Sequence, residues 1–227
     1  MVGEFRNNDK GVVLIGGINH ENLARNAVEK FYESLDDLLT SIEKVVVSLP
    51  GGRSVQSFYE KIPDMSDFLT EEDWSRVHFF WTDERLVPPS CPESNYKLAE
   101  NLFLGELMGR GIVDTDQVHR FPGEADNPER ALDSYIKDLE RISNGVIHLP
   151  ILGVGGDSHV GSLFPDSSQL EEDKPGFLFV EDSPKPPEER ISVSPETIRQ
   201  STYPFLFFIG EEKRDAYECL TEESKTY

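Results

Sequence analysis

A glycine-rich loop carries the residues best suited to chemistry. It reads Leu-Gly-Val-Gly-Gly-Asp-Ser-His-Val-Gly-Ser-Leu-Phe-Pro over residues 152–165 and places Asp157 two positions before His159. In extended backbone, side chains two apart project to the same side, so this carboxylate and imidazole can face one substrate together. An imidazole with a pKa of about 6.5 exchanges protons at neutral pH, and a carboxylate can orient it. The loop is therefore a candidate proton-transfer site, with a surface histidine in a glycine-shaped turn as the alternative.

A second loop has the layout of an anion site. Pro-Gly-Gly-Arg-Ser at 50–54 follows an apolar run and precedes a helical pattern, an order that presents backbone N–H groups to an anion. The spacing is neither that of a P-loop nor that of a dinucleotide fingerprint. A small phosphate or sugar phosphate therefore fits Gly51, Gly52, Arg53 and Ser54 better, and an ordinary tight turn is the alternative.

A third loop places charges at the end of an apolar run. Trp-Thr-Asp-Glu-Arg at 81–85 contains Asp83, Glu84 and Arg85. Charges beside apolar surface are costly unless they are paired or used. Arg85 is a candidate to clamp a phosphate or to stabilise a developing oxyanion, and an ion pair with one of the two carboxylates is the alternative.

Alternating strands and helices must position these loops. Short apolar runs predict strands at 12–15, 45–49, 77–81, 146–152, 177–180, 191–193 and 205–209. Apolar residues at helical spacing, with capping residues or first-turn prolines, predict helices at 19–42, 55–61, 96–108, 128–142, 195–200 and 211–220 and a short one opening at 70–73.

The strand patterns predict a fold class. Because the strands are hydrophobic throughout rather than alternating, we expect an α/β protein with three α/β/α layers. Its mostly parallel, Rossmann-like sheet is covered by helices on both faces, in a single domain over residues 1–227. Ligands in such folds lie at the carboxyl ends of the strands, where the three loops fall.

Composition narrows the possible partners. The net charge of −21 on 227 residues argues against a broad nucleic-acid-binding face, and no apolar run is long enough to predict a membrane span. The first residues lack the apolar core of a secretion signal, and two cysteines, Cys91 and Cys219, are too few for a disulfide framework. We expect a cytoplasmic protein, monomeric or weakly oligomeric.

The remaining histidines do not form a recognisable metal-binding pattern. His20, His78, His119 and His148 have no companion carboxylate at a recognisable spacing, and no pair has zinc-finger or metalloprotease spacing. Structural roles are expected for them, with no catalytic metal. Ser162 does not lie in a nucleophile elbow, so a covalent intermediate has little support.

Four separated motifs then resemble one family. They are Leu49-Pro-Gly-Gly-Arg-Ser54, Phe80-Trp-Thr-Asp-Glu-Arg-Leu-Val-Pro88 with Ser94-Asn95-Tyr96, Asp182-Ser-Pro-Lys-Pro-Pro-Glu-Glu-Arg-Ile191, and Gly210-Glu-Glu-Lys213. In this order, over nearly the whole chain, they resemble the 6-phosphogluconolactonases, within the wider group that includes glucosamine-6-phosphate deaminase and ribose-5-phosphate isomerase.

The resemblance implies an activity and roles for residues. The activity is hydrolysis of 6-phosphoglucono-δ-lactone, a small sugar-phosphate lactone, in the oxidative pentose phosphate pathway, without metal or organic cofactor. By the same resemblance His159 is the general base, with Asp157 beside it. Arg190, Lys213 and the turn from Gly51 to Ser54 hold the phosphate. Asp83 and Arg85 are further catalytic candidates, Arg85 for holding the substrate or its oxyanion.

Three departures from the family pattern matter. Ser158 replaces the usual glycine between Asp157 and His159, and a left-handed backbone there costs a non-glycine residue about 1–2 kcal/mol. Gly156 stands where an acidic residue is more common. Members commonly continue past Lys213 into another strand and helix, which this chain, ending at Tyr227, is expected to lack.

Two alternatives to the lactonase remain open. One is a sugar-phosphate isomerase or deaminase of the same group, which would share the phosphate turn and the Asp/His loop. The motif Asp83-Glu-Arg-Leu-Val-Pro88 and the stretch Ser183-Pro-Lys-Pro-Pro187 favour the lactonase. The other alternative is a non-catalytic sugar-phosphate sensor.

Overall fold

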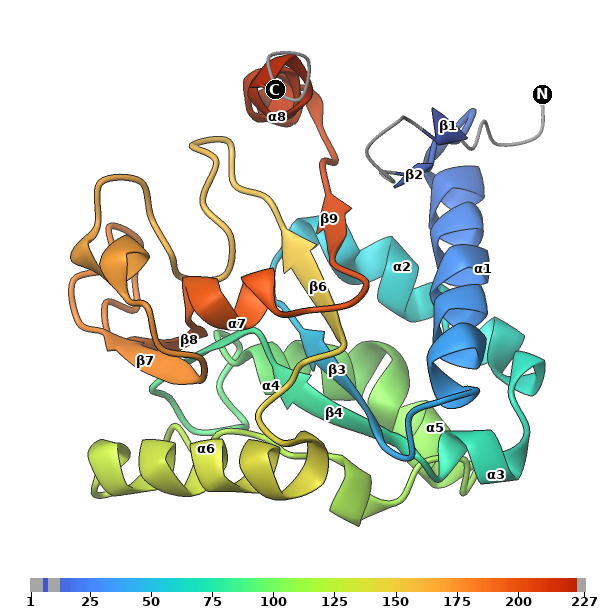
Figure 1. Cartoon of the computed structure of the whole chain (residues 1–227), viewed down its shortest axis with the longest axis horizontal. Coiled ribbons are helices and arrows are strands. Elements are labelled where there is room, and N and C mark those ends of the chain that lie inside the picture. Colours follow the sequence, from blue (N-terminus) through green and yellow to red (C-terminus); the bar gives the residue numbers. More distant parts are fainter. Residues whose placement is uncertain (1–5, 8–12, 224–227) are drawn as a thin grey trace.

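The centre of the protein is a four-stranded parallel sheet in the order β4-β3-β6-β9 (Figure 1). The computed structural model describes residues 6–7 and 13–223. The strands are β3 (Val45–Leu49), β4 (Val77–Trp81), β6 (Leu149–Gly153) and β9 (Phe205–Phe207). Every residue of β3 and β4 is buried, as expected for parallel strands covered on both sides. The predicted, mostly parallel sheet is confirmed.

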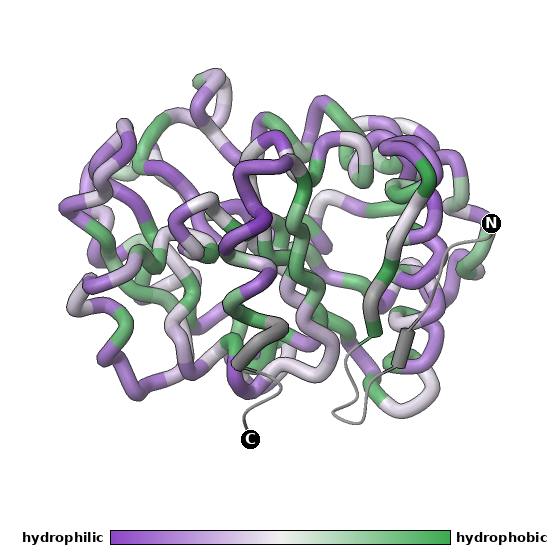
Figure 2. The backbone as a smooth tube through the Cα atoms, turned by 90° about the horizontal axis from the view of Figure 1, so that it is seen from above, coloured by the Kyte–Doolittle hydropathy of each residue, from purple (hydrophilic) through white to green (hydrophobic). Residues whose placement is uncertain are grey.

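The two faces of the sheet pack against different helices. Val45 and Val47 belong to one apolar cluster together with α1 and α2, and Val46 to a second together with α6. The helices are α1 (His20–Leu39), α2 (Gln56–Lys61), α3 (Glu71–Trp74), α4 (Asn95–Ala99), α5 (Gly105–Gly109), α6 (Pro128–Ser143), α7 (Pro195–Arg199) and α8 (Arg214–Glu223). In Figure 2 hydrophobic stretches run through the middle of the molecule. The three α/β/α layers that the sequence predicted are therefore present.

A smaller antiparallel sheet adjoins the site. It has the order β5-β8-β7, with β5 (Asp83–Arg85), β7 (Phe177–Val180) and β8 (Arg190–Val193). The register places Asp83 opposite Ser192 and Arg85 opposite Arg190. The sequence predicted β7 and β8 only as further short apolar strands. The antiparallel pairing of β8 with β5 was not visible, because it joins segments about 100 residues apart.

The first predicted strand differs from the structure. The apolar run at residues 12–15 predicted a buried strand. In the structure β2 spans only Val13–Leu14 and pairs antiparallel with β1 (Arg6–Asn7), outside the central sheet. Val13 is 39% exposed, and residue 12 lies outside the described residues. A run of four apolar residues does not specify its partner strand. No helix within residues 13–223 is long and apolar enough to cross a membrane.

The predicted helix 96–108 is interrupted. A π-helical turn, Glu100–Leu104, separates α4 from α5. Near the site, 3-10 turns lie at Arg53–Val55, before α2, and at Glu211–Lys213, before α8. The predicted helix 211–220 is therefore a 3-10 turn followed by α8.

Two buried histidines, His78 and His148, and the half-buried His119 hold elements together away from the predicted site. His148 Nδ1 accepts from the Val46 N–H at 2.9 Å. His78 Nδ1 and His119 Nε2 lie 3.0 Å apart, and the His119 ring stacks on Phe80. Burial lowers the pKa of both His78 and His119, that of His119 to about 4. The pair is therefore neutral at pH 7.

Acid is expected to destabilise the fold through this pair. In the unfolded chain a histidine binds a proton below about pH 6.5, whereas His119 in the folded protein resists protonation until the pH approaches 4. The contribution of neutral His119 is therefore complete above about pH 6.5 and is lost as the pH falls toward that lower value. Lowering the pH from about 7.5 to about 5.5 should reduce the free energy of unfolding of the unaltered protein by about 1 kcal/mol more than that of His119→Gln. Urea unfolding measures this, and equal losses in both proteins would contradict it.

Candidate active site

Loops from distant parts of the chain meet at the carboxyl ends of the parallel strands (Figure 1). A Cβ atom on Gly153, at the end of β6, would lie 3.8 Å from the Gly51 carbonyl oxygen in the turn after β3. A Cβ atom on Gly156 would lie 3.0 Å from the Glu212 carbonyl oxygen, in the turn after β9. The glycine turn, the Asp/His loop and the turn that contains Lys213 therefore converge on one edge of the sheet.

Asp157 and His159 form a hydrogen-bonded pair. His159 Nδ1 lies in a short hydrogen bond with Asp157 Oδ1. The imidazole packs against buried Phe164, with ring centroids 4.8 Å apart, and its side chain is 17% exposed. Among the described residues, none is within hydrogen-bond distance of His159 Nε2. With Nδ1–H donated to the carboxylate, Nε2 is the nitrogen available to a substrate or a water.

Backbone geometry specific to this loop brings the pair together. The Gly155 N–H donates to the His159 carbonyl oxygen at 2.8 Å, and the Ser158 N–H donates to the Gly155 carbonyl oxygen at 3.1 Å. Ser158 has φ 69°, so the loop keeps the left-handed conformation that glycine usually provides. A Cβ atom on Gly155 would lie 1.9 Å from His159 Nδ1 and 2.3 Å from Asp157 Oδ1. The pair therefore needs glycine at position 155.

Lys185 joins the pair from the proline-rich stretch. Its Nζ lies 3.3 Å from Asp157 Oδ2, 3.2 Å from His159 Nδ1 and 5.6 Å from the centroid of the Phe164 ring. The sequence interpretation treated this stretch as an extended connector and assigned Lys185 no role. Its signal was its place in the third family motif, but the 26 residues that separate it from His159 concealed the contact.

Burial and the charges within the cluster of Asp157, His159 and Lys185 keep the imidazole neutral. Burial lowers the pKa of His159, Asp157 opposes this through its hydrogen bond, and the charge of Lys185 lowers the pKa further. Burial raises the pKa of Asp157, but the hydrogen bond and charge of His159, with help from Lys185, lower it more, to about 2. At neutral pH the cluster is a carboxylate beside a neutral imidazole, the state that a general base requires.

The backbone of the glycine turn lies close against the Asn95 side chain. Gly52 has φ 92°, and a Cβ atom on Gly51 would lie 1.8 Å from Asn95 Oδ1. Buried Tyr59 donates its hydroxyl to the Pro50 carbonyl oxygen at 2.8 Å. No group among the described residues accepts from the N–H of Gly51 or Gly52. Arg53 is exposed, and Ser54 is partly exposed.

Asp83 and Glu84 are buried and fully engaged within the protein. Asp83 Oδ2 accepts from Ser162 Oγ at 2.8 Å, and its Oδ1 accepts from Asn95 Nδ2 at 3.1 Å. Glu84 accepts the backbone N–H groups of Asn95 and Tyr96 at 2.8 Å and 2.7 Å and so anchors the start of α4. Burial raises the pKa of Glu84, and these backbone hydrogen bonds oppose the rise.

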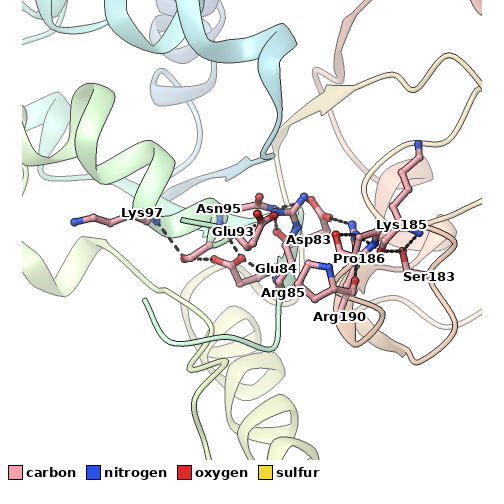
Figure 3. A network of polar contacts seen from close by, with 12 residues as sticks. Asp83, Glu84, Arg85, Glu93, Asn95, Lys97, Ser183, Lys185, Pro186 and Arg190 are labelled. Atoms are coloured by element: carbon pink, nitrogen blue, oxygen red, sulfur yellow. Dashed lines mark hydrogen bonds and ion pairs between the residues drawn. The ribbon is translucent and has the colours of Figure 1, made fainter. Parts of the chain in front are cut away.

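Arg85 does not pair with either neighbouring carboxylate. Its Nη1 donates to the Glu93 carbonyl oxygen and lies 3.9 Å from Glu93 Oε2 (Figure 3). The predicted alternative, an ion pair with Asp83 or Glu84, is therefore wrong. Because β5 is extended, consecutive side chains point to opposite sides. Arg85 Nε is buried without a hydrogen-bond partner among the described residues.

Arg190 and Lys213 occupy different environments. Arg190 is buried, and its guanidinium donates to the carbonyl oxygens of Lys185 and Pro187 at 2.7 Å and 2.8 Å. Lys213 is partly exposed, in the 3-10 turn beside Gly156. No three His, Cys, Asp or Glu side chains in residues 13–223 are grouped so that they could hold a metal ion.

The fold and the site define a class of protein. It is an α/β protein with a carboxylate–imidazole–ammonium cluster beside a glycine turn, at the carboxyl ends of a parallel sheet. A family model described as glucosamine-6-phosphate isomerases/6-phosphogluconolactonase matches residues 18–226. The chain belongs to this family.

Similar proteins carry the lactonase name. The chain is 35% identical over 192 residues to 6-phosphogluconolactonase 3, chloroplastic, of Arabidopsis thaliana, a match that covers 79% of this chain and 56% of that protein. It is 30% identical to 6-phosphogluconolactonase of Haemophilus influenzae, covering 85% and 80% respectively. The crystal structure of 6-phosphogluconolactonase from Thermotoga maritima superposes with a TM-score of 0.74 at 28% identity, covering 88% and 86%. The chain spans about 57% of the length of the rice relatives it matches.

Proposed function

We propose that this protein hydrolyses 6-phosphoglucono-δ-lactone to 6-phosphogluconate, a step of the oxidative pentose phosphate pathway, with His159 as the general base. One observation carries the proposal: Asp157 holds His159 through Nδ1, and Nε2 has no hydrogen-bond partner among the described residues, in a loop that follows Gly153 next to the glycine turn. The lactonase names of the relatives support the choice of substrate.

The chemistry needs little beyond a positioned water and a base. A lactone carbonyl is already electrophilic, so catalysis requires orientation, proton removal and stabilisation of the tetrahedral oxyanion. His159 Nε2 takes a proton from water as its oxygen attacks the carbonyl carbon. The intermediate then collapses, the bond from carbon to the ring oxygen breaks, and the imidazolium returns the proton to that oxygen. Asp157 keeps the ring oriented and stabilises its transient positive charge.

The remaining site residues would hold the substrate. The N–H groups of Gly51 and Gly52, which have no acceptor within the described part of the chain, would supply donors for the phosphate together with Arg53 and Ser54. Lys213, in the neighbouring turn, and Arg190, at the start of β8, add positive charge for the phosphate. Anchoring the phosphate away from the carbonyl converts binding energy into orientation of the lactone. Arg85 is proposed to hold the substrate or its oxyanion through its partly exposed guanidinium.

A direct assay tests the proposal. Disappearance of 6-phosphoglucono-δ-lactone is followed with and without the protein, because this ester also opens spontaneously. We expect a rate clearly above the background and a much weaker effect on glucono-δ-lactone, which lacks the phosphate. Release of ammonia from glucosamine 6-phosphate without lactone hydrolysis would identify a deaminase instead. Binding of the sugar phosphate without either reaction would identify a sensor.

The pH dependence of kcat/KM is a second test. Because burial and Lys185 lower the pKa of His159, the base stays neutral at physiological pH. After subtraction of the spontaneous reaction, kcat/KM should be level near neutrality and fall with acid only below about pH 6.5. A midpoint above that value would contradict the assigned state of His159.

A further inference from the structure

Lys185 brings a positive charge to the Nδ1 side of the Asp157–His159 pair. Its Nζ donates to Asp157 Oδ2 at 3.3 Å, whereas Asp157 Oδ1 is engaged by His159 Nδ1. The two oxygens of one carboxylate therefore bind two different groups. Nζ also lies 3.2 Å from His159 Nδ1. Because the Nδ1–H is donated to the carboxylate, Nζ is at this distance a charge beside the ring and not its hydrogen-bond partner.

The backbone of Lys185 is held in place by its neighbours (Figure 3). Its carbonyl oxygen accepts from Ser183 Oγ at 2.9 Å and from Arg190 Nη2 at 2.7 Å, and its N–H donates to Ser183 Oγ at 3.3 Å. Nζ lies 5.6 Å from the centroid of the Phe164 ring, which also packs against the imidazole of His159. Only the side-chain rotamer of Lys185 remains to be ordered when Nζ reaches the pair.

The charges that act on His159 come from three segments. Asp157 lies in the same loop, Lys185 lies in the proline-rich stretch, and Asp83 begins β5. Burial lowers the pKa of His159, the hydrogen bond from Asp157 raises it, the charge of Lys185 lowers it, and the charges of Asp157 and Asp83 raise it. A carboxylate that orients an imidazole also favours the imidazolium, which cannot accept a proton from water. Lys185 opposes this side effect and leaves the orientation intact.

We propose that Lys185 is a positioning residue for the hydrolysis: it binds Asp157 Oδ2 and places its charge beside Nδ1, so that His159 is oriented by a carboxylate and is still neutral when each turnover begins. The inference deepens the proposed function and rests on it for its kinetic part. Lys185 acts through His159, and its role requires no contact with the substrate.

The first test needs no substrate. NMR titration of the His159 imidazole, assigned with His159→Gln, is compared in the unaltered protein, Lys185→Met and Lys185→Arg. Methionine approaches the length of lysine but has neither its charge nor its donors, so Lys185→Met should raise the pKa of His159. Arginine keeps the charge and the donors, so Lys185→Arg should keep this pKa low. The Lys185 side chain is 49% exposed, so both variants should fold. An unchanged titration in Lys185→Met would show that the inference is wrong.

Lys137→Met is the matched control for this variant. Lys137 is exposed on α6 and belongs to none of the three loops. Its replacement changes the net charge of the protein by the same amount and should leave the pKa of His159 unchanged. The titration of exposed His20 should stay the same in every variant. Equal shifts of the His159 pKa in Lys185→Met and Lys137→Met would reduce the effect to the overall charge and overturn the inference.

Kinetics provide the second test. With 6-phosphoglucono-δ-lactone, and after subtraction of the spontaneous reaction, Lys185→Met should lower kcat/KM by about tenfold near pH 5.5. This is the change in the neutral fraction of the base that one unit charge at contact distance produces in a water-like dielectric. The loss should be much smaller above about pH 8, where the imidazole is neutral in both proteins. Lys185→Arg should retain most of the activity at both values of pH.

The outcomes separate the inference from the proposed function. A large rise in KM at every pH, with the His159 titration unchanged, would make Lys185 a substrate-binding residue and overturn the inference. If the unaltered protein hydrolyses no lactone but the titrations shift as stated, the proposed function fails and the action of Lys185 on His159 stands.

Discussion

Replacing His159 with alanine is expected to lower kcat by about 10²–10⁴-fold, the contribution of a well-placed general base. The side chain is the only group at the site with a neutral, unpartnered ring nitrogen among the described residues, so the water would lose its proton acceptor. KM should change little, because we propose that the phosphate is held by the glycine turn and the neighbouring cationic side chains rather than by His159. The measurement is lactone disappearance at neutral pH, corrected for the spontaneous reaction.

His20→Gln serves as the control for this variant. His20 is exposed at the start of α1 and belongs to none of the three loops, so its replacement should leave kcat unchanged. A fall of less than about tenfold in His159→Ala, below the usual range for a general base, would point to another base or to a sensor.

Gly155→Ala is expected to lower kcat by about 100-fold, because a displacement of about 1 Å at a catalytic group costs this much. The new methyl carbon would lie 1.9 Å from His159 Nδ1 and 2.3 Å from Asp157 Oδ1, so both side chains must move. The methyl group adds no charge and removes no hydrogen bond. Loss of activity would therefore report the position of the pair, measured as kcat for the lactone with circular dichroism to establish folding.

Gly109→Ala is the matched control. A Cβ atom there would meet nothing within 4 Å, and the residue ends α5 with an ordinary backbone conformation. It should keep full activity. Equal activities of Gly155→Ala and Gly109→Ala would show that the Asp157–His159 pair does not determine the rate.

Local sequence was a good guide wherever the interacting groups are close in the chain. The spacing of Asp157 and His159 indicated a pair, and Ser158 was singled out for a left-handed backbone that the structure does contain. The apolar runs at 45–49 and 77–81 match β3 and β4 residue for residue. Such features depend on backbone geometry over a few residues, which the local residue types specify.

Contacts between distant segments were not predictable in the same way. Arg85 was expected to pair with Asp83 or Glu84 if it served no ligand, but the structure gives it Glu93. The family resemblance predicted a phosphate contact for Arg190, and the sequence did not indicate that its guanidinium also donates to the carbonyl oxygens of Lys185 and Pro187. Which donor meets which acceptor depends on how the small antiparallel sheet packs beside the parallel one, and residue types alone do not encode that arrangement.

The sequence by itself determined the α/β class, the family and the chemical groups at positions 157 and 159, because strand and helix periodicity and short spacings are local properties. Only the tertiary structure decided that Lys185 reaches His159 from 26 residues away, and that Ser162 meets Asp83 across 79 residues. These contacts form when the whole chain buries its apolar surface, which selects one arrangement of loops among many that the local patterns allow.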